Sequence, residues 1–145
     1  MKVSIEEQVK LRKRAKEEME RLEEIMNDSE TIKLLDRFKN LFNLCESVYK
    51  VILKEHQIKT KGKIDGYLKL TMRQVPYAMT FAGYNIDKSL LNRLFGAKCE
   101  YGHTAKKLRD AVTHNLNQKA INEIIEREKD LFGDMYKFLD IIRAA

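Results

Sequence analysis

The sequence predicts an all-α protein, a helical bundle of four main helices with one or two extra short or flanking helices. Apolar side chains recur every three or four residues over most of the 145-residue chain, which is the spacing of one helix face. Capping residues and glycines separate these stretches, and no stretch alternates apolar and polar residues as a half-buried strand does. With 43% hydrophobic residues, we expect one domain over residues 1–145.

Residues 1–27 are predicted to form a charged flanking helix before the bundle of residues 30–143. Ser4 is suited to cap this helix, and Glu7 three residues later completes a capping box. The apolar stripe of the helix is thin and consists of Ile5, Val9, Met19, Leu22 and Met26. It is too irregular for clean heptads, which favours a solvated helix over a coiled-coil arm that reaches a partner.

The strongest helical pattern follows the turn signal Asn27-Asp28-Ser29. Its apolar face carries Ile32, Leu35, Phe38, Leu41, Phe42, Cys45, Val48, Tyr49 and Ile52. On this face Cys45 is expected to be a small buried hydrophobe rather than a nucleophile. We expect the helix to end before the basic segment 59–63, a loop that either touches a phosphate backbone or is a polar connection. His56 is then expected near the helix end.

A third helix is predicted over residues 64–82, with a kink or break at Pro76 and a stop at Gly83. Asn85 or Asp87 then caps a short helix that runs through Leu90, Leu91, Leu94 and Phe95 to Gly96. The apolar side chains of both segments are interpreted as core.

Two further helices complete the predicted bundle. The first begins at His103 or Thr104 and ends soon after His114, with a buried side made of Ala105, Leu108, Ala111 and Val112. The last is expected from about Gln118 to Arg143. Its inward side consists of Ile121, Ile124, Ile125, Leu131, Phe132, Met135, Phe138, Leu139 and Ile142.

The charge balance suits an anionic partner, because 28 Lys and Arg against 22 Asp and Glu give a formal charge of +6. Much of this charge also serves to solvate helix faces. No apolar run approaches the ~20 residues of a membrane span, so we expect a cytoplasmic protein without a membrane partner. Cys45 and Cys99 lack CxxC spacing, and Cys99 with His103 is an incomplete ligand set. We therefore expect no metal and no cofactor.

The stretch from Leu108 to Asn115 holds the chemically most useful cluster, in which a cation, a carboxylate and an imidazole fall within six residues. Arg109 can grip a phosphate bidentately, and His114 can move a proton near neutral pH. Asp110 lies four residues before His114 on the same helix face, where it could fix the imidazole and favour its protonated form. Arg109 and His114 lie roughly 140° apart on an ideal helix, so they are not natural neighbours.

This stretch resembles the HEPN (higher eukaryotes and prokaryotes nucleotide-binding) superfamily. In that family an arginine, a polar residue and a histidine in this order precede the final helix of a bundle, as Arg109, Asp110 and His114 do here. The resemblance implies a metal-independent ribonuclease acting in a toxin, phage-defence or RNA-processing setting. It also implies a homodimer in which two motif copies face each other across a cleft, and a neutralising antitoxin as a further partner.

The roles that the resemblance implies are catalytic for Arg109, His114 and Asp110. Lys106, Lys107 and Thr113 would contact the RNA substrate. The 2′-hydroxyl of the RNA would attack the adjacent phosphorus and leave a 2′,3′-cyclic phosphate and a 5′-hydroxyl. Leu116 stands where several HEPN toxins have a tyrosine that a partner enzyme modifies, so that route of control is not expected. The alternative is a non-catalytic module that binds nucleotide, RNA or a protein partner.

Overall fold

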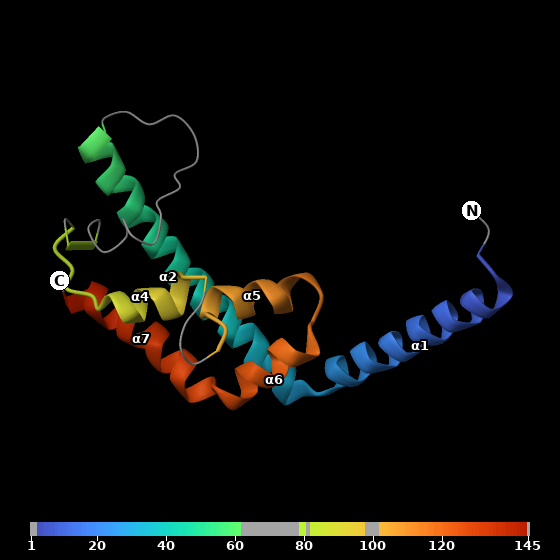
Figure 1. The fold of residues 1–145 in the computed structure, drawn as a ribbon. Helices are drawn as coiled ribbons and strands as arrows, with labels where there is room; N and C mark the ends of the chain where they lie inside the picture. The colour runs from blue at the N-terminus through green and yellow to red at the C-terminus, as the bar shows by residue number, and fades with distance from the viewer. Residues whose placement is uncertain (1–2, 62–78, 81, 98–101, 145) are drawn as a thin grey trace. The chain divides into compact units, whose positions relative to one another are not determined.

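The computed structural model describes residues 3–61, 79–80, 82–97 and 102–144, without the side chains of 57–61 (Figure 1). Over these residues the regular elements are six α-helices: α1 (Ile5–Asn27), α2 (Ser29–Lys61), α4 (Lys88–Phe95), α5 (Ala105–His114), α6 (Gln118–Glu126) and α7 (Glu128–Ala144). The predicted all-α class is confirmed. Among the helices described, we find none that combines the length and apolar character of a membrane span.

The chain forms two compact units, Met1–Asp36 and Arg37–Ala145. In the first unit Ser4 caps α1 as predicted, because its Oγ accepts the backbone N–H of Glu7 at 3.2 Å. Asp28 separates α1 from α2 and accepts hydrogen bonds from the backbone N–H and the hydroxyl of Thr31 at 3.2 and 2.9 Å. These caps satisfy N–H groups that have no partner inside a helix.

Helix α2 is longer than predicted and continues through Lys61. The expectation that it ends before residue 59 is therefore wrong, and His56 lies inside the helix instead of near its end. Neither proline nor glycine occurs between Ser29 and Lys61, and the straight-chain lysines at the end favour a helix. The remainder of the predicted basic loop, 62–63, lies outside the described residues.

Most of the predicted helix 64–82, including Pro76, also lies outside the described residues. Gly83, where the predicted helix was expected to stop, has a φ of +89° and lies in a turn, because its N–H donates to the Thr80 carbonyl at 3.0 Å. Asp87, and not Asn85, caps α4 through the Ser89 N–H at 3.0 Å. The predicted apolar residues of α4 are buried, and Gly96 follows its last turn.

An aromatic cluster around Phe95 connects α2, α4 and α7. The ring of Phe95 stacks on Tyr49 with centroids 4.0 Å apart and meets Phe42 and Phe138 at 5.8 and 5.4 Å. Such pairs contribute about 0.5–1.5 kcal/mol each beyond the area they bury. This cluster is the core against which the short helix α5 is positioned, since α4 packs against both α5 and α7.

The predicted last helix is in fact two helices, α6 and α7, with Arg127 between them in a non-helical conformation (φ −103°, ψ 18°). Most of its predicted inward residues are buried, but Ile125 is 46% exposed and that expectation is wrong. A continuous helix would place Ile125 near the α7 core positions, whereas α6 ends before Arg127 and buries Ala120, Ile121 and Ile124 instead.

Candidate functional site

The start of α5 is fixed by a buried threonine. Thr104 is fully buried, its hydroxyl accepts the Lys107 N–H at 3.3 Å, and the same hydroxyl donates to the Gly96 carbonyl at 2.9 Å. One side chain therefore caps α5 and binds the residue that ends α4. Of the two predicted starts, His103 and Thr104, the structure selects Thr104.

Arg109, in the middle of α5, binds α2 through its guanidinium. Its Nη1 donates to Asn43 Oδ1 at 2.6 Å and to Glu46 Oε1 at 3.1 Å, and its Nη2 donates to Glu46 Oε2 at 3.1 Å. Its Nε donates to Asp110 Oδ1 at 2.9 Å. The pairing with Glu46 is the bidentate arrangement that suits a planar guanidinium.

The same guanidinium lies over the ring of Phe42, with its central carbon 4.6 Å from the ring centroid. Only 14% of the Arg109 side chain is exposed, and 17% of its partner Glu46. Burial alone would lower the pKa of Arg109, but the hydrogen bonds to Glu46 and Asp110 outweigh it and raise the pKa. Arg109 is therefore a fixed cation held in one orientation by an aromatic ring and two carboxylates.

His114 is in a different environment, because it is the exposed last residue of α5. A histidine at this end of a helix lies near carbonyls without intrahelical partners, which favour a nearby cation. The expected hydrogen bond from His114 to Asp110 is not formed, since Asp110 accepts from Arg109 instead. The neighbouring guanidinium is a permanent cation, so it is the stronger partner for this carboxylate.

The three residues predicted to contact substrate are all exposed. Lys106 and Lys107 lie in the first turn of α5 and leave their ammonium groups to solvent. Thr113 donates its hydroxyl to the Arg109 carbonyl at 2.7 Å, the bond to its own helix backbone that threonine often makes. The hydroxyl of Thr113 is thereby engaged within α5.

Asn43, Glu46 and Phe42 belong to this site but were not predicted for it. They lie more than sixty residues before Arg109, which no short motif can span. The available signal was the helical spacing of four that puts Phe42 and Glu46 on one side of α2. A carboxylate at the edge of an apolar helix face indicates that a cation from another element will meet it.

A second ion-pair cluster connects the segment before α5 to α6. Glu123 accepts the backbone N–H of His103 at 2.9 Å, pairs with the His103 ring at 2.7 Å, and binds Arg127. Arg127 also donates to the His103 carbonyl at 2.8 Å. Gly102 makes this approach feasible: its φ is +128°, and a Cβ there would lie 2.9 Å from Glu123 Oε2.

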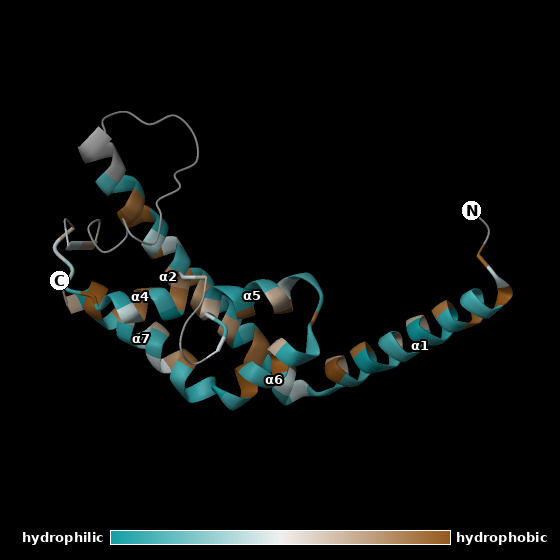
Figure 2. Ribbon diagram, viewed as in Figure 1, coloured by the Kyte–Doolittle hydropathy of each residue, from teal (hydrophilic) through white to brown (hydrophobic). Residues whose placement is uncertain are grey.

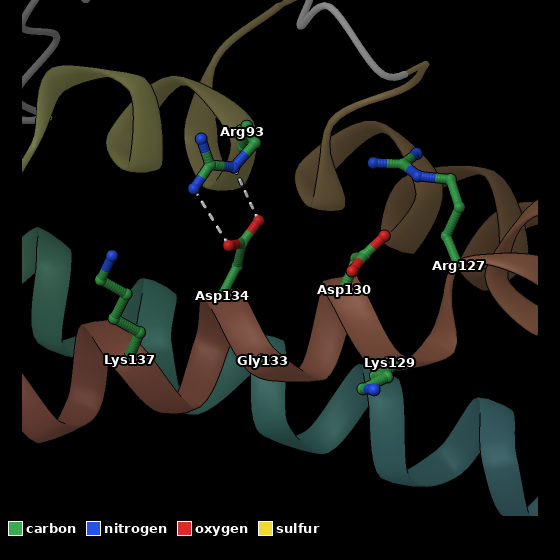
Figure 3. Close-up of a pocket in the computed structure, with 7 residues that line it drawn as sticks. All are labelled: Arg93, Arg127, Lys129, Asp130, Gly133, Asp134 and Lys137. Carbon is green, nitrogen blue, oxygen red and sulfur yellow. Dashed lines mark hydrogen bonds and ion pairs between the residues drawn. The ribbon is translucent and has the colours of Figure 1, made fainter.

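A surface groove of about 590 Å³ lies along α7 and is lined by Arg93, Arg127, Lys129, Asp130, Gly133, Asp134 and Lys137. Figure 3 shows Arg93 facing Asp134 across it, with bonds of 2.9 Å from Nε and 3.1 Å from Nη2. Both arginines of the groove are thus paired with carboxylates of α6 or α7. Charged residues line the groove, but both of its arginines are already neutralised by carboxylates.

The cysteines and metal-ligand candidates offer no second chemistry in the described part of the chain. Cys45 is buried as expected, its Sγ lies 3.7 Å from the Met135 carbonyl, and burial raises the pKa of its thiol to about 12. Cys99 lies outside the described residues, and His103 is engaged by Glu123. Within the described residues, no three His, Cys, Asp or Glu side chains converge as metal ligands would.

Comparison with known proteins gives one short match. A stretch of 58 residues is 38% identical to part of an uncharacterized protein of Methanocaldococcus jannaschii, covering 40% of this chain and 12% of that protein. No family model matches the chain, and no solved structure matches it. The chain spans 12% of the length of this curated relative.

Proposed function

We propose that the chain is a HEPN-type endoribonuclease that cleaves RNA in the cytoplasm without a metal ion. The observation that supports this most is the contrast within the motif: Arg109 is held rigidly, whereas His114 is exposed on the same helix. A base that moves a proton must reach the substrate, and an exposed imidazole can do so. The exposed Lys106 and Lys107 add positive charge that an RNA backbone would meet.

In the proposed reaction the 2′-hydroxyl of RNA attacks the adjacent phosphorus. The new bond joins the 2′-oxygen to phosphorus while the bond from phosphorus to the 5′-oxygen breaks. His114 of one copy accepts the 2′-proton as general base, and His114 of the second copy supplies a proton to the leaving 5′-oxygen. The products are a 2′,3′-cyclic phosphate and a 5′-hydroxyl. The angular separation of Arg109 and His114 favours a site that two copies share.

Arg109 would stabilise the charge that develops on the phosphoryl oxygens. Asn43 and Phe42 support this role by fixing the guanidinium before RNA binds, which reduces the entropy lost on binding, whereas Glu46 competes with the phosphate for its charge. The role proposed for Asp110 changes accordingly: it orients Arg109 through Nε and does not orient His114. A toxin or phage-defence setting with a neutralising antitoxin is part of this proposal.

A second function is favoured by one observation, the engagement of Arg109 inside the chain. Four of its hydrogen bonds go to Asn43, Glu46 and Asp110, and Glu46 already neutralises its charge. In this second function Arg109 only connects α5 to α2, and the exposed surface around His114 binds RNA or a protein without cleaving RNA. The two functions are distinguished by RNA cleavage: a ribonuclease loses it when His114 is replaced, whereas a binding module cleaves no RNA with or without His114.

The deciding experiment is cleavage of a mixed RNA substrate in EDTA, with product ends analysed and a 2′-deoxy substrate as control. We expect the wild type to leave cyclic phosphate ends and His114→Ala to lose at least a hundredfold in rate, since general acid-base catalysis contributes about 10²–10⁴-fold. His103→Ala is the matched control, because it removes another exposed imidazole next to the same helix. Its cleavage rate should match the wild type.

Glu46→Gln separates the two roles of Arg109. If Arg109 meets a phosphate, loss of the competing carboxylate charge should strengthen RNA binding and steepen its salt dependence. If Arg109 only ties helices together, RNA affinity should not change. No cleavage by a folded wild type, with Glu46→Gln binding RNA as the wild type does, would reject the ribonuclease and leave the binding module.

A further inference from the structure

Helix α1 exposes a row of large apolar side chains. Ile5, Val9, Met19 and Met26 are 78%, 52%, 52% and 67% exposed on one side of the helix. Leu11 is 54% exposed on a different side, and Ile25 is the buried residue of the helix. Figure 2 shows the hydrophobic positions recurring along the helix. Exposed apolar residues that follow one helix face indicate a surface that another helix covers.

The spacing of this face fits a coiled-coil seam. Starting at Ile5, steps of four and three residues lead in turn to Val9, Arg12, Lys16, Met19, Glu23 and Met26. This alternation is the 3.5-residue repeat of the a and d positions that two paired helices share. The seam, meaning these seven residues, is apolar at four positions and charged at three, which is why the apolar stripe alone looks irregular.

The charges of α1 are divided between its two halves. Residues 10–16 contain the cations Lys10, Arg12, Lys13, Arg14 and Lys16 and no carboxylate. Residues 17–24 contain the carboxylates Glu17, Glu18, Glu20, Glu23 and Glu24, with Arg21 as their one cation. A second α1 running parallel would bring like charges together, whereas an antiparallel one would bring each cationic half onto an acidic half.

We propose that α1 is a homodimerisation element that pairs antiparallel with α1 of a second copy of this chain. In an antiparallel coiled coil an a position of one helix meets a d position of the other. One register satisfies this from Val9 to Met26 by pairing Val9 with Met26, Arg12 with Glu23 and Lys16 with Met19, each pair occurring twice across the two-fold axis. Ile5 lies beyond the paired part of the seam in this register.

Each of these pairs is chemically suitable. Val9 and Met26 are an apolar contact at both ends of the seam, and Met26 can adapt to the branched valine. Arg12 and Glu23 form two reciprocal ion pairs that also fix the register. Lys16 can lay its aliphatic stem on Met19 while its ammonium group stays in water. The pairing uses neither Arg109 nor His114, so it stands independently of the proposed ribonuclease activity.

Sedimentation equilibrium of the full chain tests the proposal through charge exchange. Arg12→Glu and Glu23→Arg each turn two attractive pairs into two repulsive ones and should raise the dimer Kd about tenfold or more. The double variant R12E/E23R restores opposite charges in the same register, so its Kd should return to within about threefold of the wild type. Arg14→Glu and Glu17→Arg make the same charge changes away from the seam and should leave the Kd unchanged.

Orientation is tested by mixing two differently tagged chains, one with Val9→Cys and one with Met26→Cys, under mild oxidation. The antiparallel register predicts disulfide-linked heterodimers and no enrichment of homodimers over the wild-type mixture, because two copies of position 9 lie at opposite ends of the seam. A monomer at every concentration, a Kd that ignores Arg12→Glu, or homodimer crosslinks at position 9 would overturn the proposal. Cleavage of RNA is measured separately, so either proposal can fail alone.

Discussion

Two residues of one short helix, Arg109 and His114, occupy opposite environments. Arg109 is 14% exposed, lies over Phe42 and makes a bidentate pair with Glu46 of α2. His114 ends the same helix five residues later and is exposed. The sequence predicts one functional unit, but in the structure only Arg109 contributes contacts to the fold, whereas His114 is a surface residue.

Substitutions at Arg109 and at His114 should therefore act in different ways. A loss of activity in an Arg109 variant mixes lost chemistry with lost structure, because the side chain joins α5 to α2. A loss of activity in a His114 variant reports on the surface alone. Measurements of the free energy of unfolding can test this division. The expected loss of stability is largest for Arg109 in the middle of α5, smaller for Thr104 at its start, and smallest for Glu123 on α6.

The largest effect is expected for Arg109→Ala. The change leaves Glu46 mostly buried without its cation and removes the contact with the Phe42 ring. We expect the free energy of unfolding to fall by about 3 kcal/mol, measured by urea denaturation followed by far-ultraviolet circular dichroism. His114→Ala is the control from the same helix and should cost less than about 0.5 kcal/mol. Equal losses in the two variants would contradict the division between them.

The start of α5 should be the next most sensitive position. Thr104→Val keeps the shape of the side chain but removes the hydroxyl that binds Gly96 and Lys107. We expect a loss of about 2 kcal/mol, because a buried cap and a buried hydrogen bond are lost together. Thr104→Ser keeps the hydroxyl and loses one methyl group, so it should cost about 1 kcal/mol. If Thr104→Ser were less stable than Thr104→Val, packing of the methyl group and not the cap would hold the start of α5.

Local signals in the sequence predicted much of the helix pattern around this site. Asp87, Gly96 and Thr104 cap or follow helices as expected, because capping uses side chains within three residues of the helix end. The burial of Cys45 followed from its place on the apolar face of α2. Such features depend on near neighbours, so a single sequence contains them.

Features that depend on distant contacts were not predictable in the same way. The break at Arg127 has neither proline nor glycine to mark it, and it coincides with hydrogen bonds from Arg127 to His103 and Glu123. The enclosure of Arg109 required knowing that Glu46, 63 residues away, lies beside it. The sequence located the motif on a helix, but only the contacts of Arg109 with α2 separate the environments of its residues.

The smallest of the three stability effects concerns Glu123, the carboxylate on α6 that holds the segment before α5. Burial opposes ionisation of Glu123, but hydrogen bonds from His103 and Arg127 outweigh it, so its pKa is lowered in the fold. The folded protein therefore binds the proton less well than the unfolded chain, in which the pKa is about 4.3. The stabilisation by Glu123 is present above that pH and is lost as the pH falls through the lower folded value.

Glu123→Gln tests this linkage, because glutamine keeps the shape and cannot ionise. We expect the variant to be about 1 kcal/mol less stable at pH 7. The gap between the two proteins should close as the pH is lowered from 5 toward 2, measured by urea denaturation at each pH. Glu126→Gln is the matched control on the same helix, where the side chain is exposed, and its stability curve should follow the wild type. A gap that stays constant with pH would mean that Glu123 stabilises the segment before α5 by its shape and not by its charge.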